Sequence, residues 1–509
     1  MRLRKDYDDY DSWSCHPRLP LANLRLRMSA RITTTARENV PLCVDLDGTL
    51  IKTDMLWESF VRLLRQNPLW LVVMPLWWIR GRAVLKQQLA ARVQVDVAAL
   101  PYNGLFLEFL REAKRQGRRL ILASASDHEL ANAVAKHVGL FDEVLASDGR
   151  RNLRGNHKLE TLTERFGDRG FDYAGNSSVD LAVWKGTREA IVVNASRNLT
   201  RQAARIAKVG HYFPPKASPL LALLKALRPH QWVKNLIVFV PIITSHQMSF
   251  WPMAAGAAAF TALCLCASAG YVLNDLMDLD ADRHHPVNRR RPFASGNLPL
   301  SLGLLLVPLL LAASAFVAWQ MTKPFVALMG FYFVVTTVYS SHLKRVPLLD
   351  AFVLAGLYTL RLIAGHVVTG IAYSAWLLMF SMFIFLSLAL MKRFRELRTL
   401  RQQNEMDAKG RGYTVDDLEL VATLGLVSGY LAVLVLALYV NSPQVLELYQ
   451  HPLLLLLICP LLLYWISRVW LLAHRGQMHT DPVLFALKDW PSYVIGALSL
   501  AVMWLATGR

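Results

Sequence analysis

The stretch Asn274-Asp275-Leu276-Met277-Asp278-Leu279-Asp280-Ala281-Asp282-Arg283 follows directly on a long apolar run, residues 253–273. On a helix, with about 100° per residue, Asp275, Asp278 and Asp282 fall within about 60° of one another. Asn274 borders that face, and Asp280 points away from it. Three carboxylates converging at the edge of a membrane repel one another strongly unless a divalent cation lies between them. Because charge in membrane segments is costly and usually functional, this pattern predicts a Mg²⁺ site.

On both sides of this motif the chain forms about nine apolar segments of membrane-spanning length. They lie at 236–251, 253–273, 301–321, 324–340, 349–370, 375–391, 418–440, 452–472 and 491–507. The first is the least regular, because it is short and contains His246. The sequence therefore predicts an all-α polytopic membrane bundle in residues 236–509, preceded by a linker with an interfacial helix in 211–235.

The distribution of charge supports a membrane protein. The chain has 509 residues, 54% of them apolar, and a formal net charge of +19. Such a charge can indicate nucleic-acid binding, but here it lies in the Arg-rich residues 1–40 and in alternate short loops. The intervening loops carry little beyond Lys323, which is the positive-inside pattern if the soluble part is cytoplasmic. We expect no nucleic-acid partner, a disordered arm in 1–40, and insertion in a bacterial inner membrane.

Polar residues near the acidic motif complete a candidate site. Arg291-Pro292 and Ala294-Ser295-Gly296 suit an anion-binding loop, because fixed turns carry a guanidinium group there. Arg361 lies within an apolar segment, where it faces either a phosphate or the carboxylate of Asp350. The candidate substrate-binding residues are Lys234, Asn235, Asn274, Arg283, Arg291, Tyr339, Asp350 and Arg361; the candidate catalytic residues are Asp275, Asp278, Asp282 and Lys344.

Residues 41–210 read differently, as short apolar strands that alternate with helical stretches. This alternation predicts a parallel, Rossmann-like α/β sheet, whose chemistry lies at the carboxyl ends of its strands. Asp45 and Asp47 leave the first strand into a turn at Gly48. Two carboxylates at this spacing can serve as nucleophile and general acid around Mg²⁺. Ser124 and Lys158 are candidates for holding a phosphoryl group.

The DLDGT motif (45–49), Ser124, Lys158 and the Gly175-to-Asp180 segment occur in the order of the haloacid dehalogenase superfamily, which this part resembles. The resemblance implies that Asp45 is the nucleophile and Asp47 the general acid/base. It also implies that Ser124 and Lys158 bind the phosphate. The implied ligands of Mg²⁺ are Asp45, Asp47, Asn176 and Asp180. One departure is Asn176, where the fourth motif usually has Asp, and an amide contributes less charge to a metal. We expect an active phosphatase, with a domain retained for packing or regulation as the alternative.

An apolar insertion, PLWLVVMPLWWI (68–79), separates the first two motifs. It is too short to span a bilayer, which takes about 20 residues. The core of a cap and a contact with the membrane surface explain it equally well.

The membrane half resembles the UbiA prenyltransferase superfamily, in particular its decaprenyl-phosphate phosphoribosyltransferase branch. The resemblance rests on NDxxDxxxD (274–282), QWVKN (231–235), DRxHP (282–286), RPxASG (291–296), YSxxLKxxPxxD (339–350) and DPVxFAxxD (481–489). It implies Mg²⁺-dependent transfer of phosphoribose from phosphoribosyl diphosphate to a polyprenyl phosphate. The fusion also implies that the phosphatase domain removes the 5-phosphate from the lipid-linked product.

Two alternatives stay open at this point. A prenyl diphosphate could donate its tail to an aromatic acceptor at the same acidic site, although Lys344 and the DRxHP loop favour the sugar donor. A transporter or lipid-binding protein with no activity is the alternative from another class. The clustering of charge at one face disfavours it, because transporter sites usually lie near the bilayer midplane.

Overall fold

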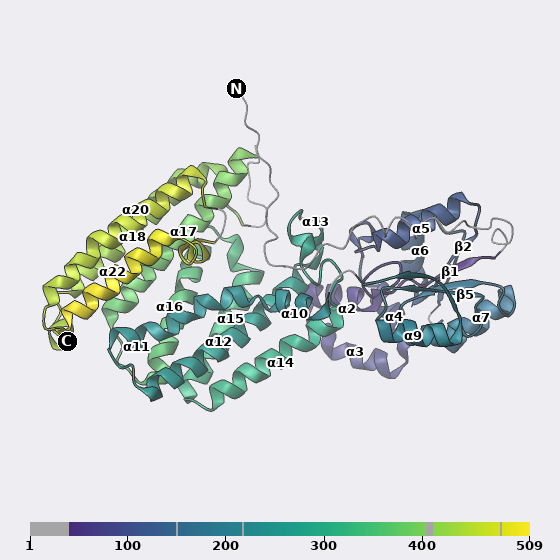
Figure 1. Cartoon of the computed structure of the whole chain (residues 1–509), viewed down its shortest axis with the longest axis horizontal. Coiled ribbons are helices and arrows are strands. Elements are labelled where there is room, and N and C mark those ends of the chain that lie inside the picture. Colours follow the sequence, from purple (N-terminus) through teal and green to yellow (C-terminus); the bar gives the residue numbers. More distant parts are fainter. Residues whose placement is uncertain (1–39, 149–150, 216–217, 404–410, 479–480, 509) are drawn as a thin grey trace, which may run out of the picture.

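The computed structural model describes residues 40–148, 151–215, 218–403, 411–478 and 481–508. It consists of a sheet domain and a helical bundle that lie end to end (Figure 1). The predicted arm, apart from Val40, lies outside the described residues.

The sheet domain is a six-stranded, fully parallel sheet in the order β3-β2-β1-β4-β5-β6. The strands are β1 (Leu42–Val44), β2 (Leu120–Asp127), β3 (Glu143–Ser147), β4 (Asp172–Gly175), β5 (Glu189–Val193) and β6 (Lys208–Phe213). The helices α5 (Gly104–Arg115), α6 (His128–Val138), α7 (Asn156–Phe166), α8 (Asp180–Trp184) and α9 (Arg197–Ile206) connect them. Buried apolar clusters form on both faces of the sheet, as expected when crossover helices cover it. The predicted fold class of this domain is confirmed.

Three helices are inserted between β1 and β2 and form a cap: α2 (Met55–Gln66), α3 (Trp70–Ile79) and α4 (Arg82–Ala90). Met74 and Trp77 of α3 pack in a cluster with Leu63, Leu85 and Leu89. The sequence reading of 68–79 as the core of a cap is therefore right for one side of α3.

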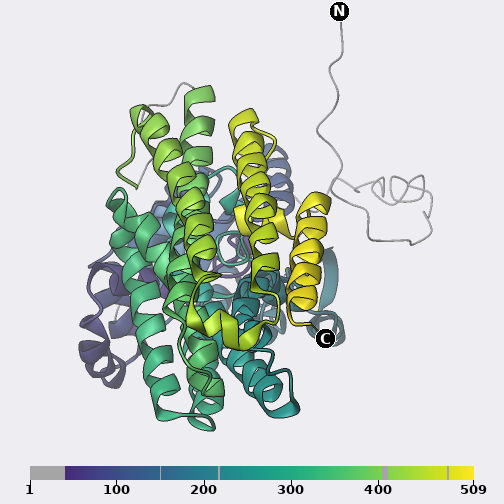
Figure 2. The ribbon, with the colours of Figure 1, turned by 90° about the vertical axis from the view of Figure 1, so that its left-hand side faces the viewer.

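The bundle contains seven helices long and apolar enough to span a membrane among the residues that the structure describes. They are α12 (Phe250–Met277), α14 (Leu300–Trp319), α15 (Lys323–Ser341), α16 (Leu349–Thr369), α17 (Ala375–Gln402), α18 (Leu418–Tyr439, extended by a 3-10 turn) and α20 (Ile458–Arg475, likewise extended). A shorter apolar helix, α22 (Trp490–Ala506), corresponds to the last predicted segment. Figure 2 shows these helices running side by side with similar tilt.

The first predicted segment, 236–251, is not a single helix. It divides into the 3-10 helix η2 (Pro229–Phe239) and α11 (Val240–Thr244). Pro241 lies at the start of α11, where its missing N–H is tolerated, and interrupts the continuous helical ladder. The 28-residue α12 begins only at Phe250.

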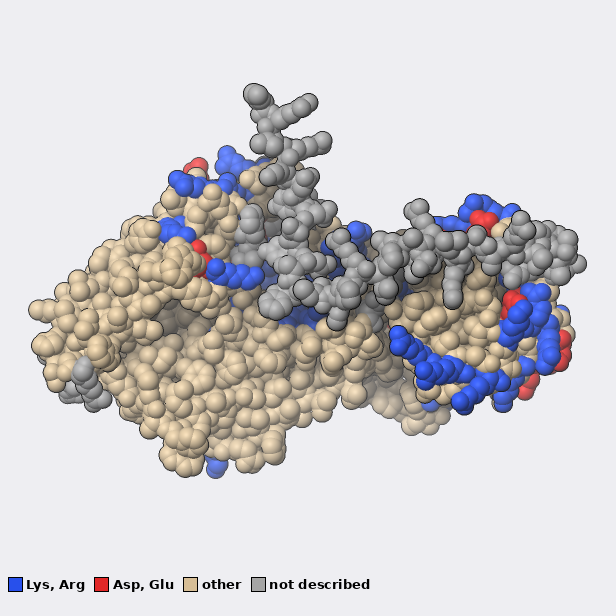
Figure 3. Space-filling view, viewed as in Figure 1, with Lys and Arg blue, Asp and Glu red and all other residues tan. Residues whose placement is uncertain are grey.

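The junction between the two parts is built from α2 of the cap, α10 (Pro219–Leu227) and α13 (Leu279–His284), which lie between the bundle and the sheet (Figure 1). Val61 of α2, Ala226 of α10 and Leu276 of α12 share one buried apolar cluster. Charged side chains gather over the sheet domain and along the upper edge of the bundle, whereas the broad lower flank of the bundle is almost free of them (Figure 3).

Candidate active sites

The first site lies at the carboxyl ends of β1, β2 and β4. Asp45 Oδ1 accepts a hydrogen bond from Lys158 Nζ at 2.7 Å, which confirms that the lysine lies beside the predicted nucleophile. Asp47 accepts from Met55 N at 2.8 Å and from Ser126 Oγ at 2.5 Å. Gly48, with φ of 75°, makes the turn between strand and cap. An added Cβ there would lie 2.0 Å from Asn176 Nδ2, so only glycine leaves room for Asn176.

Asp180 is held by a dense set of donors. Its Oδ2 accepts from the amides of Asn176 and Ser177 and from Ser177 Oγ, at 2.8–3.0 Å. Its Oδ1 accepts from the hydroxyl of Tyr173 at 3.0 Å, and this hydroxyl accepts from Lys158 Nζ at 2.9 Å. Tyr173 thus joins the lysine to the third carboxylate. The sequence did not single it out, because an aromatic residue within a strand reads as core.

One predicted residue does not reach the site. The Ser124 hydroxyl is fully buried and accepts a hydrogen bond from the amide of Ser126. The neighbouring Ala125 lines the cavity instead, because side chains alternate along the strand. The prediction that Ser124 binds phosphate is therefore not supported, whereas Ser126, two residues on, contacts Asp47.

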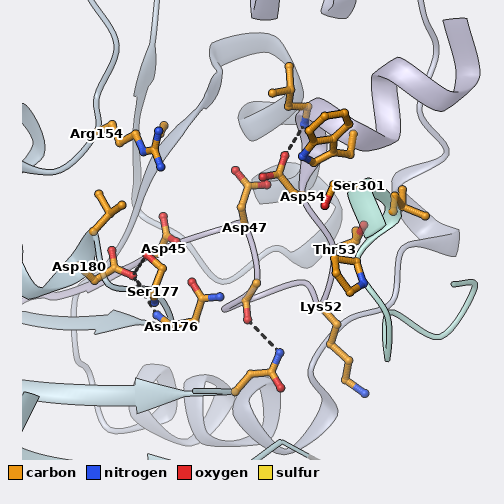
Figure 4. A pocket seen from close by; sticks show the side chains of 18 of the residues that line it. Asp45, Asp47, Lys52, Thr53, Asp54, Arg154, Asn176, Ser177, Asp180 and Ser301 are labelled. Carbon is orange, nitrogen blue, oxygen red and sulfur yellow. Dashed lines mark hydrogen bonds between the residues drawn. The ribbon is translucent and has the colours of Figure 1, made fainter. Parts of the chain in front are cut away.

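The side chains of this site line a cavity of about 860 Å³ (Figure 4). Its walls come from the sheet domain, from the cap and from the beginning of α14. Asp45, Asp47 and Asp180 lie at its floor, and five basic residues also line it: Lys52, Arg82, Lys86, Arg154 and Lys158. Gly296, Leu300 and Ser301 of the membrane half close the opposite side. The cavity is therefore shared between the two parts of the chain.

Burial sets the electrostatics of this floor. The pKa of Asp45 is raised to about 7, chiefly by burial; the charge of Lys158 opposes this rise, and the neighbouring carboxylates of Asp180 and Asp47 add to it. The pKa of Asp47 is raised to about 6, again chiefly by burial and in part by the neighbouring carboxylate of Asp54. Burial lowers the pKa of Lys86. Because the pKa values of both carboxyl groups are raised, a bound cation would favour their ionised forms.

The second site lies where α12 ends and α13 begins. Asp275 Oδ1 accepts from Arg228 at 2.5 Å and lies 3.3 Å from Arg291, which also donates to Asp282 Oδ2 at 2.7 Å. Lys344 Nζ lies 3.4 Å from Asp278 Oδ2. The three predicted carboxylates and two of the predicted cations are therefore brought together. Arg228 was missed, because the sequence showed it only as part of the lead-in to the first apolar segment.

Asn274 donates to Ser340 Oγ at 2.9 Å, which ties α12 to α15 beside this site. Burial raises the pKa of Asp282, which lies outside the spans, and Arg291 opposes the shift. Asp280 points away, as predicted, and binds Arg62 and Arg65 of the cap at 2.5 and 3.6 Å.

Arg283 does not face this site. Its guanidinium group is buried and donates to both carboxylate oxygens of Glu58 in the cap, at 2.6 and 3.0 Å. Its Nε donates to the carbonyl of Ala294 at 3.2 Å. Glu58 also binds Arg62 at 2.5 Å and Thr53 at 2.7 Å. The structure therefore does not bring Arg283, predicted to bind substrate, to the acidic site, because the buried carboxylate of Glu58 in the other domain binds its guanidinium group.

Three further residues predicted to bind substrate, Asn235, Asp350 and Arg361, instead contact other side chains or backbone groups of the protein. Arg361 donates to Asn235, to the Leu357 carbonyl and to Tyr332, at 2.6–2.8 Å, and lies against two tyrosine rings. Asn235 is buried by this contact. The alternative in which Arg361 pairs with Asp350 is wrong. A fully buried Asp350 lies 2.5 Å from Arg393 and accepts from Tyr413 at 2.6 Å.

The remaining predicted residues lie near these groups. The hydroxyl of Tyr339 accepts from Arg393 at 3.2 Å, so it belongs to the cluster around Asp350. Lys234 Nζ lies 3.1 Å from Asp481, and Lys392 lies 3.8 Å from the same carboxylate. Asp481 joins this basic pair through the DPV turn that begins α21 (Pro482–Ala486).

Mg²⁺ was predicted at both sites, and the donors present can be tested for fit. Among the described residues no three His, Cys, Asp or Glu side chains are close enough together to hold an ion unaided. Individual atoms nevertheless suit it. Asp275 Oδ2 is buried and has no hydrogen-bond partner in the described part of the chain. At the first site the pKa values of Asp45 and Asp47 are raised, so a bound cation would stabilise the ionised form of both carboxyl groups.

Comparison with known proteins agrees with this division. The UbiA prenyltransferase family matches residues 236–506, and the haloacid dehalogenase-like hydrolase family matches residues 42–184. An uncharacterized protein of Sinorhizobium fredii is 37% identical over 92% of this chain and 91% of its own length. The decaprenyl-phosphate phosphoribosyltransferase of Mycolicibacterium smegmatis is 35% identical over 42% of this chain and 68% of its own length. A solved structure of a UbiA homolog from Archaeoglobus fulgidus, bound to DMAPP and Mg²⁺, aligns with a TM-score of 0.43 and 17% identity, over 56% of this chain and 99% of that one.

The match to residues 236–506 covers more than half of the chain and includes the acidic site at the end of α12. The chain is therefore an integral membrane protein that belongs to the UbiA prenyltransferase family and carries a haloacid dehalogenase-like domain in front of its membrane half.

Proposed function

We propose that the membrane half transfers phosphoribose from phosphoribosyl diphosphate to a polyprenyl phosphate. The observation that carries this proposal is the acidic cluster of Asp275, Asp278 and Asp282, which is lined by Arg291 and Lys344. This combination suits a diphosphate whose charge is shared between a metal ion and fixed cations. The similarity to a decaprenyl-phosphate phosphoribosyltransferase supports the identity of donor and acceptor.

In the proposed reaction an oxygen of the polyprenyl phosphate attacks C1 of the ribose. The bond from C1 to the diphosphate breaks, and the diphosphate leaves with the bonding electrons. Mg²⁺, held by Asp275, Asp278 and Asp282, would supply charge neutralisation to the leaving diphosphate. Lys344 and Arg291 stabilise the charge that develops on the same oxygens. The chain's remaining contribution is to orient the two substrates, so no covalent enzyme intermediate is needed.

We assign the phosphate of the lipid acceptor to the pair of lysines formed by Lys234 and Lys392. Lys234 and Lys392 both face Asp481, and a phosphate can exchange with that carboxylate as their partner. Arg361 and Asn235 lie behind this group and fix each other. We assign them a positioning role in place of direct contact with substrate.

We further propose that the haloacid dehalogenase-like domain is a phosphohydrolase that removes the 5-phosphate from the lipid-linked product. The specific observation is the shared cavity, in which Gly296, Leu300 and Ser301 of the membrane half lie on the side opposite the carboxylates of the soluble site. Asp45 attacks phosphorus, and the bond from phosphorus to the sugar oxygen breaks as Asp47 gives that oxygen a proton. Water then hydrolyses the aspartyl phosphate. Mg²⁺, held by Asp45, Asp47, Asn176 and Asp180, would offset phosphate charge when bound.

The proposal includes a bacterial inner membrane with the soluble domain in the cytoplasm, where phosphoribosyl diphosphate is available to the basic face. An aromatic-acceptor prenyltransferase would use the same diphosphate site. The contact between Lys344 and Asp278 favours the sugar donor, because it adds a cation where a second phosphate group would lie.

The test uses membranes that contain the full chain, radiolabelled phosphoribosyl diphosphate, a polyprenyl phosphate and Mg²⁺. We expect label in the organic phase with the unaltered chain and none with Asp278→Ala. The labelled lipid should lose its 5-phosphate only when Asp45 is intact. Transfer of a prenyl group to an aromatic acid, without transfer of label, would replace the proposed branch by the aromatic one. No transfer to either acceptor would favour a non-catalytic membrane protein.

A further inference from the structure

One surface of the cap is left without a partner by the contacts described above. α3 consists of ten apolar residues, WLVVMPLWWI, and only Met74 and Trp77 are buried. The side chains on its other side are strongly exposed, with Val72 at 74% and Ile79 at 79%. Leu69, Leu71, Leu76 and Trp78 are also more than half exposed. An apolar patch of this kind on a folded domain marks an interaction site.

The place of α3 in the molecule indicates what covers this patch. α2, on which α3 packs, also contacts α14, and Figure 1 shows α3 beside the beginning of α14. That end of α14 adjoins the junction, so it is the end of the span nearest the soluble domain. Further along α14, Leu305, Leu309 and Phe316 are exposed, as expected of a span that faces lipid. The exposed side of α3 thus continues the apolar flank of the bundle at the level where its spans leave the bilayer.

The chemistry of the helix fits that level. Ten residues extend about 15 Å, half of the apolar thickness of a bilayer, so α3 can lie in the interface but cannot cross it. The guanidinium groups of Arg82 and Arg92 lie over the rings of Trp78 and Trp77, at 5.5 and 4.8 Å. Tryptophan and arginine together are typical of the headgroup layer, where the ring meets lipid and the cation meets phosphate.

We propose that α3 is a bilayer-contact helix, inserted into the headgroup layer on the side of the membrane that carries the soluble domain. What this contact implies about the substrate of the soluble site rests on the phosphohydrolase activity proposed above. Trp78 and Arg82 line the shared cavity together with Leu300 and Ser301 of α14. With α3 in the interface, the mouth of this cavity lies at the headgroups, and the site takes phosphomonoesters carried on lipids in preference to water-soluble ones.

The direct test of the contact uses the full chain in nanodiscs of phosphatidylethanolamine with a minor fraction of phosphatidylglycerol. The photoreactive residue p-benzoylphenylalanine replaces Val72 in one variant and Leu105 in the control. Leu105 is exposed on α5, a helix of the sheet domain outside the cap, so it samples an apolar side chain of the same domain that is not part of α3. We expect phospholipid adducts from position 72 and none from position 105. Absence of lipid adducts at 72, or adducts with a second copy of the chain, would overturn the proposal.

The functional test measures the hydrolysis of two phosphomonoesters by the unaltered chain, by the double variant Val72→Asp/Ile79→Asp and by the control variant Leu105→Asp. The probes are ribose 5-phosphate in solution and polyprenyl-phosphoryl-5-phosphoribose in the nanodisc. The double variant should lose about tenfold or more of its rate on the lipid probe, with the rate on ribose 5-phosphate nearly unchanged. Equal loss on both probes would mean that the cap itself is damaged and that substrate selection does not depend on α3. If the unaltered chain hydrolyses neither probe, the phosphohydrolase proposal fails, whereas cross-linking still decides the bilayer contact.

Discussion

The two acidic sites of this chain balance their charge in opposite ways. At the soluble site, called cation-poor below, Lys158 pairs with Asp45, whereas amide and hydroxyl donors bind Asp47 and Asp180. At the membrane site the carboxylates of Asp275 and Asp282 share Arg291, and Arg228 and Lys344 add two further cations. A nucleophile gains from having little fixed positive charge beside it. A site that holds a charged leaving group gains from fixed cations.

The largest expected effect is that of Asp45→Asn at the cation-poor site. Removing the nucleophile should lower phosphatase activity by about 10⁴-fold or more. The folded-state pKa of Asp45 is raised to about 7, so ionised Asp45 costs stability, and this cost grows as pH rises from its unfolded pKa to 7. The variant should therefore melt at a higher temperature than the unaltered chain at pH 7.5 without Mg²⁺, with the difference vanishing near pH 4.

Mg²⁺ sharpens this comparison. It should raise the melting temperature of the unaltered chain more than that of Asp45→Asn, because the variant has lost an anionic ligand. Phosphoribosyl transfer by the same variant should remain at its usual rate. A melting temperature lower than that of the unaltered chain at pH 7.5 would show that Lys158 fully compensates the buried carboxylate, contrary to the comparison.

The second effect concerns the cation-rich site. Arg291→Gln removes the group shared by Asp275 and Asp282 and should lower phosphoribosyl transfer by about 10²- to 10³-fold. The two carboxylates then repel each other with less compensation, so the concentration of Mg²⁺ needed for half-maximal rate should fall. Steady-state rates across a Mg²⁺ titration measure both quantities. A higher Mg²⁺ requirement would mean that Arg291 orients the carboxylates more than it competes with the metal.

The sequence was sufficient for the residues whose spacing is local. Asp275, Asp278 and Asp282 are spaced at helical intervals and stay close although the helix breaks at Asp278, and Asp45 and Asp47 leave one strand, so their local spacing was enough to group them. Lys158 was found because it belongs to an ordered set of motifs. Asp280 was correctly assigned to the opposite side of the helix, although its partners Arg62 and Arg65, more than two hundred residues away, were not foreseen.

Contacts between the two halves were beyond sequence reasoning. Arg283 stands beside the acidic motif and was therefore assigned to substrate, yet Glu58 of the cap binds it. Nothing local distinguishes an arginine that faces a phosphate from one that faces a buried carboxylate. The same limit applies to Asp350 and Arg361, which have separate partners brought in by other helices. The break at Pro241 is different, because the proline was visible and its effect on the first apolar segment could have been predicted.

The third effect tests the link between the sites. Glu58→Gln leaves Arg283 and Arg62 without their buried counter-ion and should destabilise the fold by about 3–5 kcal/mol. Arg283 also binds the Ala294 carbonyl, in the loop that carries Arg291. Loosening that loop should lower phosphoribosyl transfer by about 10- to 100-fold, with a smaller change in phosphatase activity on ribose 5-phosphate.

The matched control is Arg65→Gln, a half-exposed partner of Asp280 at the same junction. An exposed pair contributes about 0–1 kcal/mol, so transfer should be nearly unchanged. Equal losses from the two variants would show that any disturbance of the junction matters, and that Glu58 has no special position. Equal losses of transfer and phosphatase activity in Glu58→Gln would indicate general unfolding.

The smallest effect returns to the cation-poor site. Tyr173→Phe removes the hydroxyl that accepts from Lys158 and donates to Asp180, while the ring stays in the core. Two hydrogen bonds to charged groups are lost, and the one to Lys158 lies beside the nucleophile; at about 1.5 kcal/mol its loss should lower phosphatase kcat/KM about tenfold. Tyr102→Phe is the control, since the Tyr102 hydroxyl binds the Val97 carbonyl and does not line the cavity. An unchanged rate would mean that Lys158 is positioned by Asp45 alone. A loss above about 200-fold would exceed what one hydrogen bond to a charged group supplies, and Lys158 would then depend on Tyr173 to remain beside the nucleophile.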